Sequence, residues 1–64
     1  MMPWTPEYFP SSMRYLTEPV RLKAIAIANA LLAQEMEEGK AIRIAIAKAK
    51  EWARHNGLPV RYDE

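Results

Sequence analysis

Two long helix-forming segments are separated by only a few residues, and this short link constrains the fold more than any other feature of the sequence. Thr17-Glu18-Pro19 offers a helix start, because threonine or glutamate can cap free amides and proline is tolerated in the first turn. We expect one helix over about residues 18–35 and a second from Glu37 or Glu38 to about His55. A link this short places two helices side by side and antiparallel. The predicted fold is therefore mainly α, built on a helix hairpin.

The segments outside the hairpin carry stop signals and turn signals. Asn56-Gly57-Leu58-Pro59 ends the second helical segment, because Gly57 can adopt the left-handed conformation and Pro59 cannot continue a helix. Residues 1–10 hold three of the five prolines and three of the six aromatic residues, which predicts an extended strap.

Two shorter elements are expected beside the hairpin. Ser11 and Ser12 can cap a single helical turn over residues 13–16, because a serine hydroxyl accepts from the free amides of a first turn. Val60-Arg61-Tyr62 alternates apolar and polar residues, a pattern that allows a short strand beside Pro3-Trp4. The chain ends would then form a tiny two-stranded sheet.

The length of 64 residues predicts one small helical domain over residues 1–64. The chain has no cysteine and one histidine, so its stability must come from efficient packing or from oligomerisation rather than from a disulfide or a metal. No segment has the apolar length of a membrane span, and residues 1–10 do not have the pattern of a signal peptide. We therefore expect a cytoplasmic protein.

The second helical segment has one apolar face and one basic face. Projection at 100° per residue places these residues on the apolar face: Ala41, Ile42, Ala45, Ile46, Ala49, Trp52 and Ala53. The opposite face carries Lys40, Arg43, Lys48, Lys50, Glu51, Arg54 and His55. Ile44 lies within this polar face.

The first helical segment has two apolar stripes, and a helix that is apolar on two sides needs cover on two sides. One stripe consists of Val20, Ala24, Ile27 and Leu31, and the other of Leu22, Ile25, Ala26, Leu32 and Met36. The second helix can cover the first stripe, and the strap with Met13, Tyr15 and Leu16 can cover the other. Where the strap is too small, the second stripe becomes a homodimer surface.

The basic face of the second helical segment is the candidate binding surface. Lys40, Arg43, Lys50 and Arg54 recur at steps of three, seven and four residues, which fit the alternating three-residue and four-residue spacing of one helix face. Such a row can contact an acidic protein, an anionic membrane surface or a nucleic-acid backbone. It can equally be a solvated face, and the absence of interleaved aromatic residues disfavours single-strand binding.

The sequence offers no convincing catalytic or metal site. His55 lies at a helix end without a carboxylate or nucleophile at triad spacing, and no phosphate-binding glycine loop is present. Glu35, Glu37 and Glu38 lack the oxygen-ligand spacing of a calcium loop and suit helix ends instead. We therefore expect no enzyme activity, no cofactor and no small-molecule substrate.

The aromatic residues of the strap have two readings. Trp4, Tyr8 and Phe9 could present a peptide-binding face next to the prolines, but so short a chain needs apolar volume inside. We expect them in the core.

Several segments resemble the N-terminal module of the uncharacterised bacterial YdaT-like proteins, over nearly the whole chain up to about Ala53. The resemblance rests on Met2-Pro3-Trp4, Tyr8 to Ser12, Pro19-Val20-Arg21, Lys23-Ala24-Ile25-Ala26-Ile27-Ala28-Asn29-Ala30, Glu37-Glu38-Gly39-Lys40-Ala41-Ile42 and Ala47-Lys48-Ala49-Lys50-Glu51-Trp52-Ala53. The sequence departs from that pattern at Glu35, where the family is expected to have a glycine.

More distantly, the chain resembles the ChaB family of small bacterial proteins labelled as cation transport regulators. The shared features are the Met-Pro-aromatic start, a proline before the first helix and Ile42-Arg43-Ile44-Ala45 in the second. This resemblance implies a helical core with a tiny sheet made by the chain ends. A cation-related role follows by analogy alone.

These observations predict a small, non-enzymatic bacterial protein that acts as a protein-interaction or regulatory module. Its partner is expected to be another protein or a second copy of the chain. The alternative is weak, non-specific binding of nucleic acid or an anionic surface through Lys40, Arg43, Lys50 and Arg54.

Overall fold

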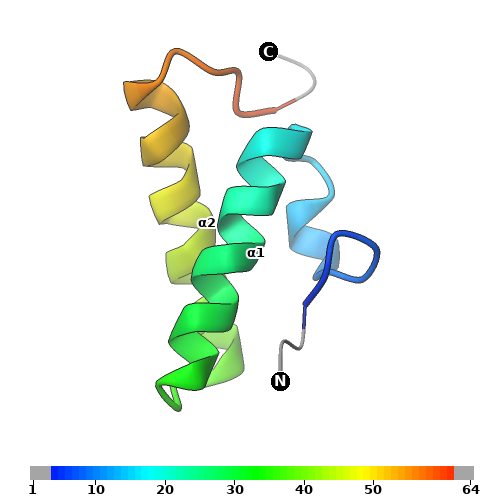
Figure 1. Ribbon diagram of the computed structural model, residues 1–64, viewed down its shortest axis with the longest axis vertical. Helices are drawn as coiled ribbons and strands as arrows, with labels where there is room; N and C mark the ends of the chain where they lie inside the picture. Colours follow the sequence, from blue (N-terminus) through cyan, green and yellow to red (C-terminus); the bar gives the residue numbers. More distant parts are fainter. Residues whose placement is uncertain (1–3, 62–64) are drawn as a thin grey trace.

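The computed structural model describes residues 4–61 and is dominated by two α-helices. A short 3₁₀ helix, η1 (Ser11–Met13), precedes α1 (Glu18–Ala33), and α2 (Glu38–His55) follows. Figure 1 shows α1 and α2 running antiparallel side by side, with η1 on the other side of α1 in that view. The predicted mainly α helix hairpin is confirmed. No helix within residues 4–61 has both the length and the apolar character of a membrane span.

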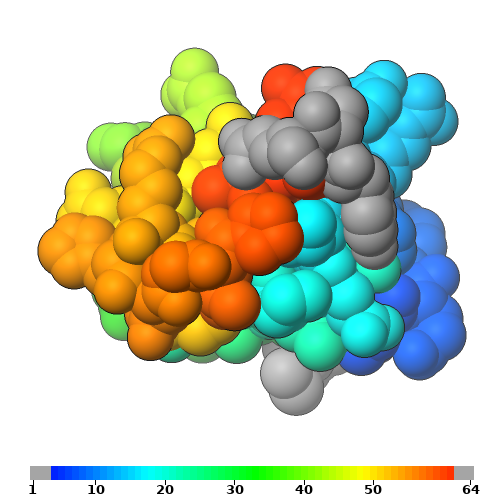
Figure 2. Space-filling model, turned by 90° about the horizontal axis from the view of Figure 1, so that it is seen from above, coloured from blue at the N-terminus to red at the C-terminus, as the bar shows by residue number. Residues whose placement is uncertain are grey.

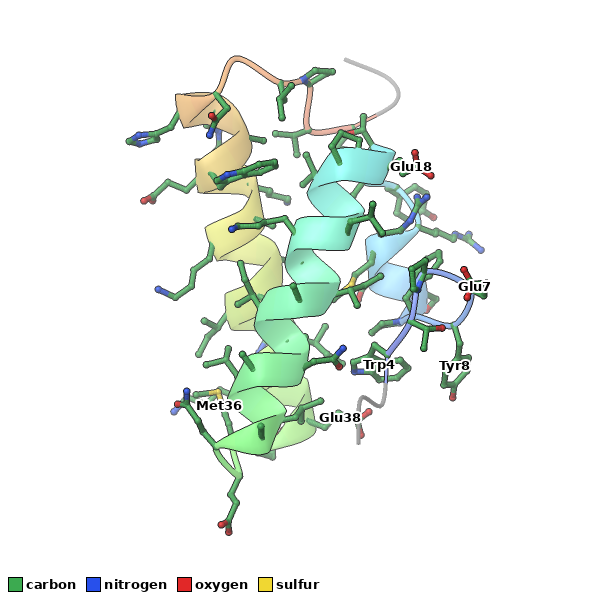
Figure 3. All side chains as sticks on the ribbon, viewed as in Figure 1. Trp4, Glu7, Tyr8, Glu18, Met36 and Glu38 are labelled. Atoms are coloured by element: carbon green, nitrogen blue, oxygen red, sulfur yellow. The ribbon has the colours of Figure 1, made fainter. Side chains whose placement is uncertain are left out.

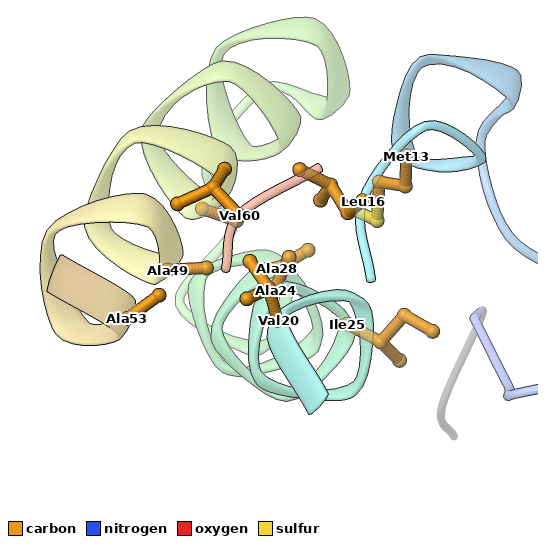
Figure 4. Packing of buried hydrophobic residues seen from close by; sticks show 10 residues of the cluster. Met13, Leu16, Val20, Ala24, Ile25, Ala28, Ala49, Ala53 and Val60 are labelled. Atoms are coloured by element: carbon orange, nitrogen blue, oxygen red, sulfur yellow. The ribbon is translucent and has the colours of Figure 1, made fainter. Parts of the chain in front are cut away.

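The two helices meet through small side chains. Every fourth residue of α2 along this interface is a fully buried alanine, and we call this set the alanine stripe: Ala41, Ala45, Ala49 and Ala53. The stripe faces fully buried residues of α1 at the same spacing: Val20, Ala24 and Ala28. Figure 4 shows Ala49 and Ala53 turned toward α1. Because alanine is small, the two helix axes can approach closely and gain many backbone and methyl contacts.

Side chains from outside the hairpin complete the core. Met13 of η1 is fully buried, and Leu16 and Val60 are nearly so. In Figure 4, Val60 lies above the gap between the helices, and Met13 and Leu16 lie beside it. Figure 2 shows the orange-to-red segment after α2 lying against the beginning of α1, so the segment that follows α2 covers the open end of the hairpin.

The end of α2 has the conformation that the sequence predicts. Gly57 has a φ of 67°, in the left-handed region. The amide of Leu58 donates to the carbonyl of Ala53 (2.9 Å), and the amide of Gly57 donates to that of Arg54 (3.3 Å). These two bonds define a Schellman motif, which satisfies carbonyls that the helix leaves free.

The end of α1 uses the same motif without a glycine. The amide of Met36 donates to the carbonyl of Leu31 (3.2 Å), and the amide of Glu35 donates to that of Leu32 (2.9 Å). Glu35 occupies the left-handed position with a φ of 64°. A non-glycine residue in this region carries a steric cost of roughly 1–2 kcal/mol. The helix still ends here because Met36 turns back toward the hairpin and is half-buried (Figure 3).

Replacing Glu35 with glycine should therefore stabilise the protein. We expect the free energy of unfolding to rise by about 1 kcal/mol, because glycine adopts the left-handed conformation without the steric cost of a Cβ atom. Thermal unfolding followed by circular dichroism measures the change. Gln34→Gly is the matched control: position 34 has a φ of −91°, so glycine offers no relief there and should be destabilising. A melting temperature of Glu35→Gly at or below that of the parent chain would contradict this explanation.

The N-terminus of α2 is capped by a glutamate. Glu37 is the N-cap residue, and its Oε1 atom accepts a hydrogen bond from the amide of Lys40 (3.2 Å). A Cβ atom at position 39 would lie 2.9 Å from that oxygen, so Gly39 leaves room for the cap. The expected helix-end role of Glu37 is confirmed, and Glu38 lies in the first turn beside it.

Two polar side chains attach the flanking segments to α1. Asn29 is buried and forms a reciprocal pair with the backbone of Trp4, accepting from its amide (3.2 Å) and donating to its carbonyl (2.9 Å). Thr17 donates from its hydroxyl to the carbonyl of Pro59 (2.8 Å). Each bond satisfies polar groups that would otherwise be partly buried without a partner.

Within the described residues 4–10, a tight turn interrupts the predicted extended strap. Thr5 and Tyr8 exchange backbone hydrogen bonds (2.8 and 3.1 Å) around Pro6 and Glu7, which makes a tight turn. The Thr5 hydroxyl also accepts from the amides of Glu7 and Tyr8. Proline at the second position of a turn favours this reversal of the chain. A threonine hydroxyl that accepts a hydrogen bond from the amide two residues ahead favours it as well.

The predicted serine caps are wrong, and the described part of the predicted terminal sheet pairs with another segment. Pro10, not a serine, is the N-cap residue of η1, and no side chain caps that turn. Arg61 forms an isolated antiparallel bridge with Leu16, and Val60 accepts from the amide of Thr17 (3.0 Å). Val60 and Arg61 therefore pair with the segment before α1, whereas the backbone of Trp4 is hydrogen-bonded to Asn29 of α1. The proposed strand partners Pro3 and Tyr62 lie outside the described residues.

The second apolar stripe of α1 is divided by the fold. Ile25 is buried in the cluster that contains Met13 and Leu16, as expected for the strap side. Leu22 and Ala26 are exposed, whereas Leu32 and Met36 are half-buried. The residues of the stripe differ in burial because Ile25 and Asn29 form the face of α1 that contacts the N-terminal segment. Leu22 lies outside this contact.

Candidate functional site

The basic face predicted from the sequence lies on the outer side of α2, opposite the alanine stripe. We use the name basic face for Lys40, Arg43, Lys50 and Arg54. Lys40, Arg43 and Arg54 are exposed and Lys50 is half-buried. The first and last members are fourteen positions apart, so the row is about 21 Å long at the rise of an α-helix. One helix therefore brings all four predicted residues to one side of the protein.

The charges of this face are not occupied by the rest of the chain. Within residues 4–61, none of its four side chains forms an ion pair or a side-chain hydrogen bond. Exposed Ala47 lies in the middle of the row, between Arg43 and Lys50. The guanidinium and ammonium groups can therefore contact an external anion without first breaking an internal bond.

Helix-end electrostatics explain only part of the row. Arg54 and His55 are in the last turn of α2, where the helix dipole favours cations. Lys40 is in the first turn, where the same dipole favours anions, and Arg43 follows one turn later. Stabilisation of the helix accounts for the basic residues at the C-terminal end but not for those at the N-terminal end.

The strap aromatics do not form one binding face. Trp4 and Phe9 are half-buried and pack against the core, as expected. Tyr8 was expected in the core and is instead 66% exposed; its ring centroid lies 5.2 Å from that of Trp4. Figure 3 shows Trp4 beside α1 and Tyr8 farther out. The turn at Thr5 reverses the chain and carries Tyr8 outward.

A cation covers the tryptophan of α2. The Lys23 ammonium of α1 lies 5.4 Å from the centroid of the Trp52 ring, and Trp52 is half-buried. A similar contact places the Arg21 guanidinium 4.9 Å from the centroid of the Phe9 ring. These cation–π contacts close the edges of the core and give no sign of a ligand site.

One cluster of cations, at η1, was not predicted from the sequence. The guanidinium of Arg14 lies 5.1 Å and that of Arg61 lies 5.6 Å from the ring centroid of Tyr15. A surface hollow of about 260 Å³ is lined by Ser11, Ser12, Arg14 and Tyr15. Arg61 is 46 residues from Tyr15 along the chain, so no local pattern could place it there.

The outer face of α1 is a weaker candidate surface. Its exposed apolar residues are Pro19, Leu22, Ala26, Ala30 and Ala33. Leu22, at 42% exposure, is the large one among them. Stable interfaces depend on a few large side chains that fill pockets, and alanines supply little of that contact.

Together, the fold and the basic face define a small helix-hairpin module with one exposed cationic side. Over 52 residues the chain is 56% identical to the uncharacterized protein YdaT of Bacillus subtilis (strain 168), and the match covers 81% of this chain. The predicted likeness to YdaT is thus supported by a curated homologue. The match spans 35% of YdaT, so the chain corresponds to about a third of that protein.

The other comparisons do not extend this result. No family model matches the chain, so the resemblance to ChaB is not supported. No solved structure matches it either.

Proposed function

We propose that this chain is a non-enzymatic interaction module that binds an acidic segment of a partner protein through the basic face of α2. The observation that carries the proposal is the row of four cations along about 21 Å of one helix, with no internal partners among the described residues. An acidic peptide in extended or helical form can follow such a row and neutralise several of the charges at once.

The packing of the hairpin supports this role. The core uses the inner side of α2 through the alanine stripe, and the segments before α1 and after α2 cover other parts of the hairpin. The outer side of α2 is left to solvent, and Ala47 is exposed there between Arg43 and Lys50. We place the module in the cytoplasm, because a chain without cysteine suits a reducing compartment.

Binding to a nucleic-acid backbone is the alternative for the same face. It needs cations at similar spacing, and its affinity would fall as salt rises. Trp52 of α2 packs against the core and not among the cations, so the basic face has no aromatic side chain for base stacking. We therefore favour an acidic protein segment as the ligand, and the experiment below also tests binding of nucleic acid.

The test compares Arg43→Glu with Lys48→Glu in the full chain. Both residues are exposed on α2 and change the net charge equally, but Lys48 is not one of the four residues that define the basic face and lies about 140° around the helix from Arg43. Fluorescence anisotropy measures binding of a labelled glutamate-rich peptide and of a mixed-sequence DNA duplex at several salt concentrations. We expect peptide binding that weakens as salt rises, weakens roughly ten-fold in Arg43→Glu and changes less than about two-fold in Lys48→Glu.

Three outcomes would count against the proposal. Peptide binding that is absent at low salt removes the proposed ligand class. Equal losses in the two variants would show that net charge, not the basic face, drives binding. Tighter binding of the DNA duplex than of the peptide would replace the acidic-protein reading with the alternative.

A further inference from the structure

The cluster at η1 differs from the basic face in its geometry. Tyr15 is 53% exposed, and two guanidinium groups lie within 6 Å of its ring centroid. In Figure 1, η1 and α2 lie on different sides of α1. A ligand at this cluster would therefore not compete with one on the outer side of α2.

The Arg14 side chain has unused hydrogen-bond donors. Its Nη2 atom donates to the hydroxyl of Tyr15 (3.1 Å), and within residues 4–61 the side chain forms no ion pair. A guanidinium has five N–H donors in a planar fork, which matches the oxygens of a phosphate group. Most of these donors remain available beside the hollow.

The hollow supplies further groups that suit an anion. Ser11 and Ser12 line it, and their hydroxyls make no side-chain hydrogen bond within the described part of the chain. Its volume is about 260 Å³, several times the roughly 30 Å³ that one water molecule occupies in the liquid. Serine hydroxyls and arginine donors together are typical of sites that bind phosphate.

The pKa of Tyr15 reflects the positive charges around its hydroxyl. The pKa of Tyr15 lies below its ordinary value of 10.0, first because Arg14 donates a hydrogen bond to the phenol oxygen and then because Arg14 and Arg61 are positively charged. A cationic environment that favours a phenolate also favours an external anion.

We propose that Arg14, Arg61, Ser11 and Ser12 around Tyr15 form a binding site for a phosphate group, either free phosphate or the phosphate of a small monoester. The guanidinium of Arg14 binds the phosphate oxygens directly, and the serine hydroxyls donate from the wall of the hollow. Arg61 adds positive charge beside the ring of Tyr15. This site goes beyond the interaction role of α2 and does not depend on it.

The experiment is an NMR titration of the full chain at constant ionic strength, first with inorganic phosphate and then with methyl phosphate. We expect saturable shifts of the amides of Ser12, Arg14 and Tyr15. Arg14→Gln should weaken binding about ten-fold, the effect of losing one strong charge-assisted hydrogen bond. Lys48→Gln removes the same charge from an exposed position of α2 outside the basic face and should leave the affinity within about two-fold.

A second readout separates binding from general screening. Phosphate bound at Arg14 should raise the pKa of Tyr15, and this response should be lost in Arg14→Gln, which keeps an exposed side chain and so should fold. Tighter binding of methyl phosphate identifies a monoester as the ligand, and tighter binding of inorganic phosphate identifies the free anion. Absence of saturable shifts with both probes, or an equal loss in Lys48→Gln, would overturn the proposal.

Discussion

Replacing Ala49 with leucine is expected to lower the free energy of unfolding by about 3 kcal/mol, because overpacking a tight core costs on the order of 1–3 kcal/mol and this interface cannot widen locally. Ala49 is fully buried between α1 and α2, where neighbouring Ala45 and Ala53 are also fully buried. The additional three carbon atoms would have to push the helices apart. For a domain of this size the melting temperature should fall by roughly 15 °C.

The control for this prediction is on the same helix. Ala47→Leu adds the same atoms at an exposed position, and leucine and alanine both favour helices. We expect a change within about 0.5 kcal/mol. Calorimetry of the two variants makes the comparison, and a leucine at position 49 that is tolerated as well as one at position 47 would show that the helices do not meet through the alanine stripe.

Truncating Met13 to alanine is the second large effect. Met13 and Val20 are the largest side chains that are fully buried, and Met13 is supplied by η1 rather than by the hairpin. Removal of a buried methionine side chain costs about 2–5 kcal/mol through lost burial and the cavity left behind. We expect about 3 kcal/mol, a large part of the roughly 3–10 kcal/mol available to 64 residues.

Met36→Ala is the comparison for Met13→Ala. Met36 is only half-buried at the hairpin turn, so the same truncation removes less contact and should cost about 1 kcal/mol. Urea unfolding gives both values. If Met36→Ala proved the more damaging variant, the segment before α1 would not be part of the core, and the assignment of η1 to the folded unit would fail.

The hairpin could be predicted from the sequence because its signals are local. Glu18 and Pro19 in the first turn of α1, Glu37 as a cap and Gly57 after α2 act within one turn of the helix ends that they define. The separation of the basic face from the alanine stripe follows from the 3.6-residue period alone. These features need no knowledge of distant contacts.

The segments outside the hairpin were harder to predict because their contacts are distant in sequence. Asn29 holds Trp4 across 25 residues, and Thr17 holds Pro59 across 42. Composition suggested an extended strap, but the Thr5 hydroxyl and Pro6 select a turn. Asn29, a polar residue buried in the apolar segment of α1, was the one available indication that a backbone from another segment is hydrogen-bonded there.

The two candidate sites also differ in whether the sequence could predict them. All members of the basic face are on one helix, so their spacing revealed them. The cluster at Tyr15 combines Arg14, its neighbour, with Arg61 from the tail, and only the pairing of the tail with Leu16 brings them together. Periodicity cannot detect a site of this kind.

The claim that the outer side of α2 is the binding surface is tested most directly by mapping a bound glutamate-rich peptide on the chain by NMR. We expect the perturbed amides to follow one line along α2, from Lys40 through Arg43 and Lys50 to Arg54, with α1 unaffected. Perturbations centred on Leu22 and Ala26 of α1, with those α2 amides unmoved, would contradict it.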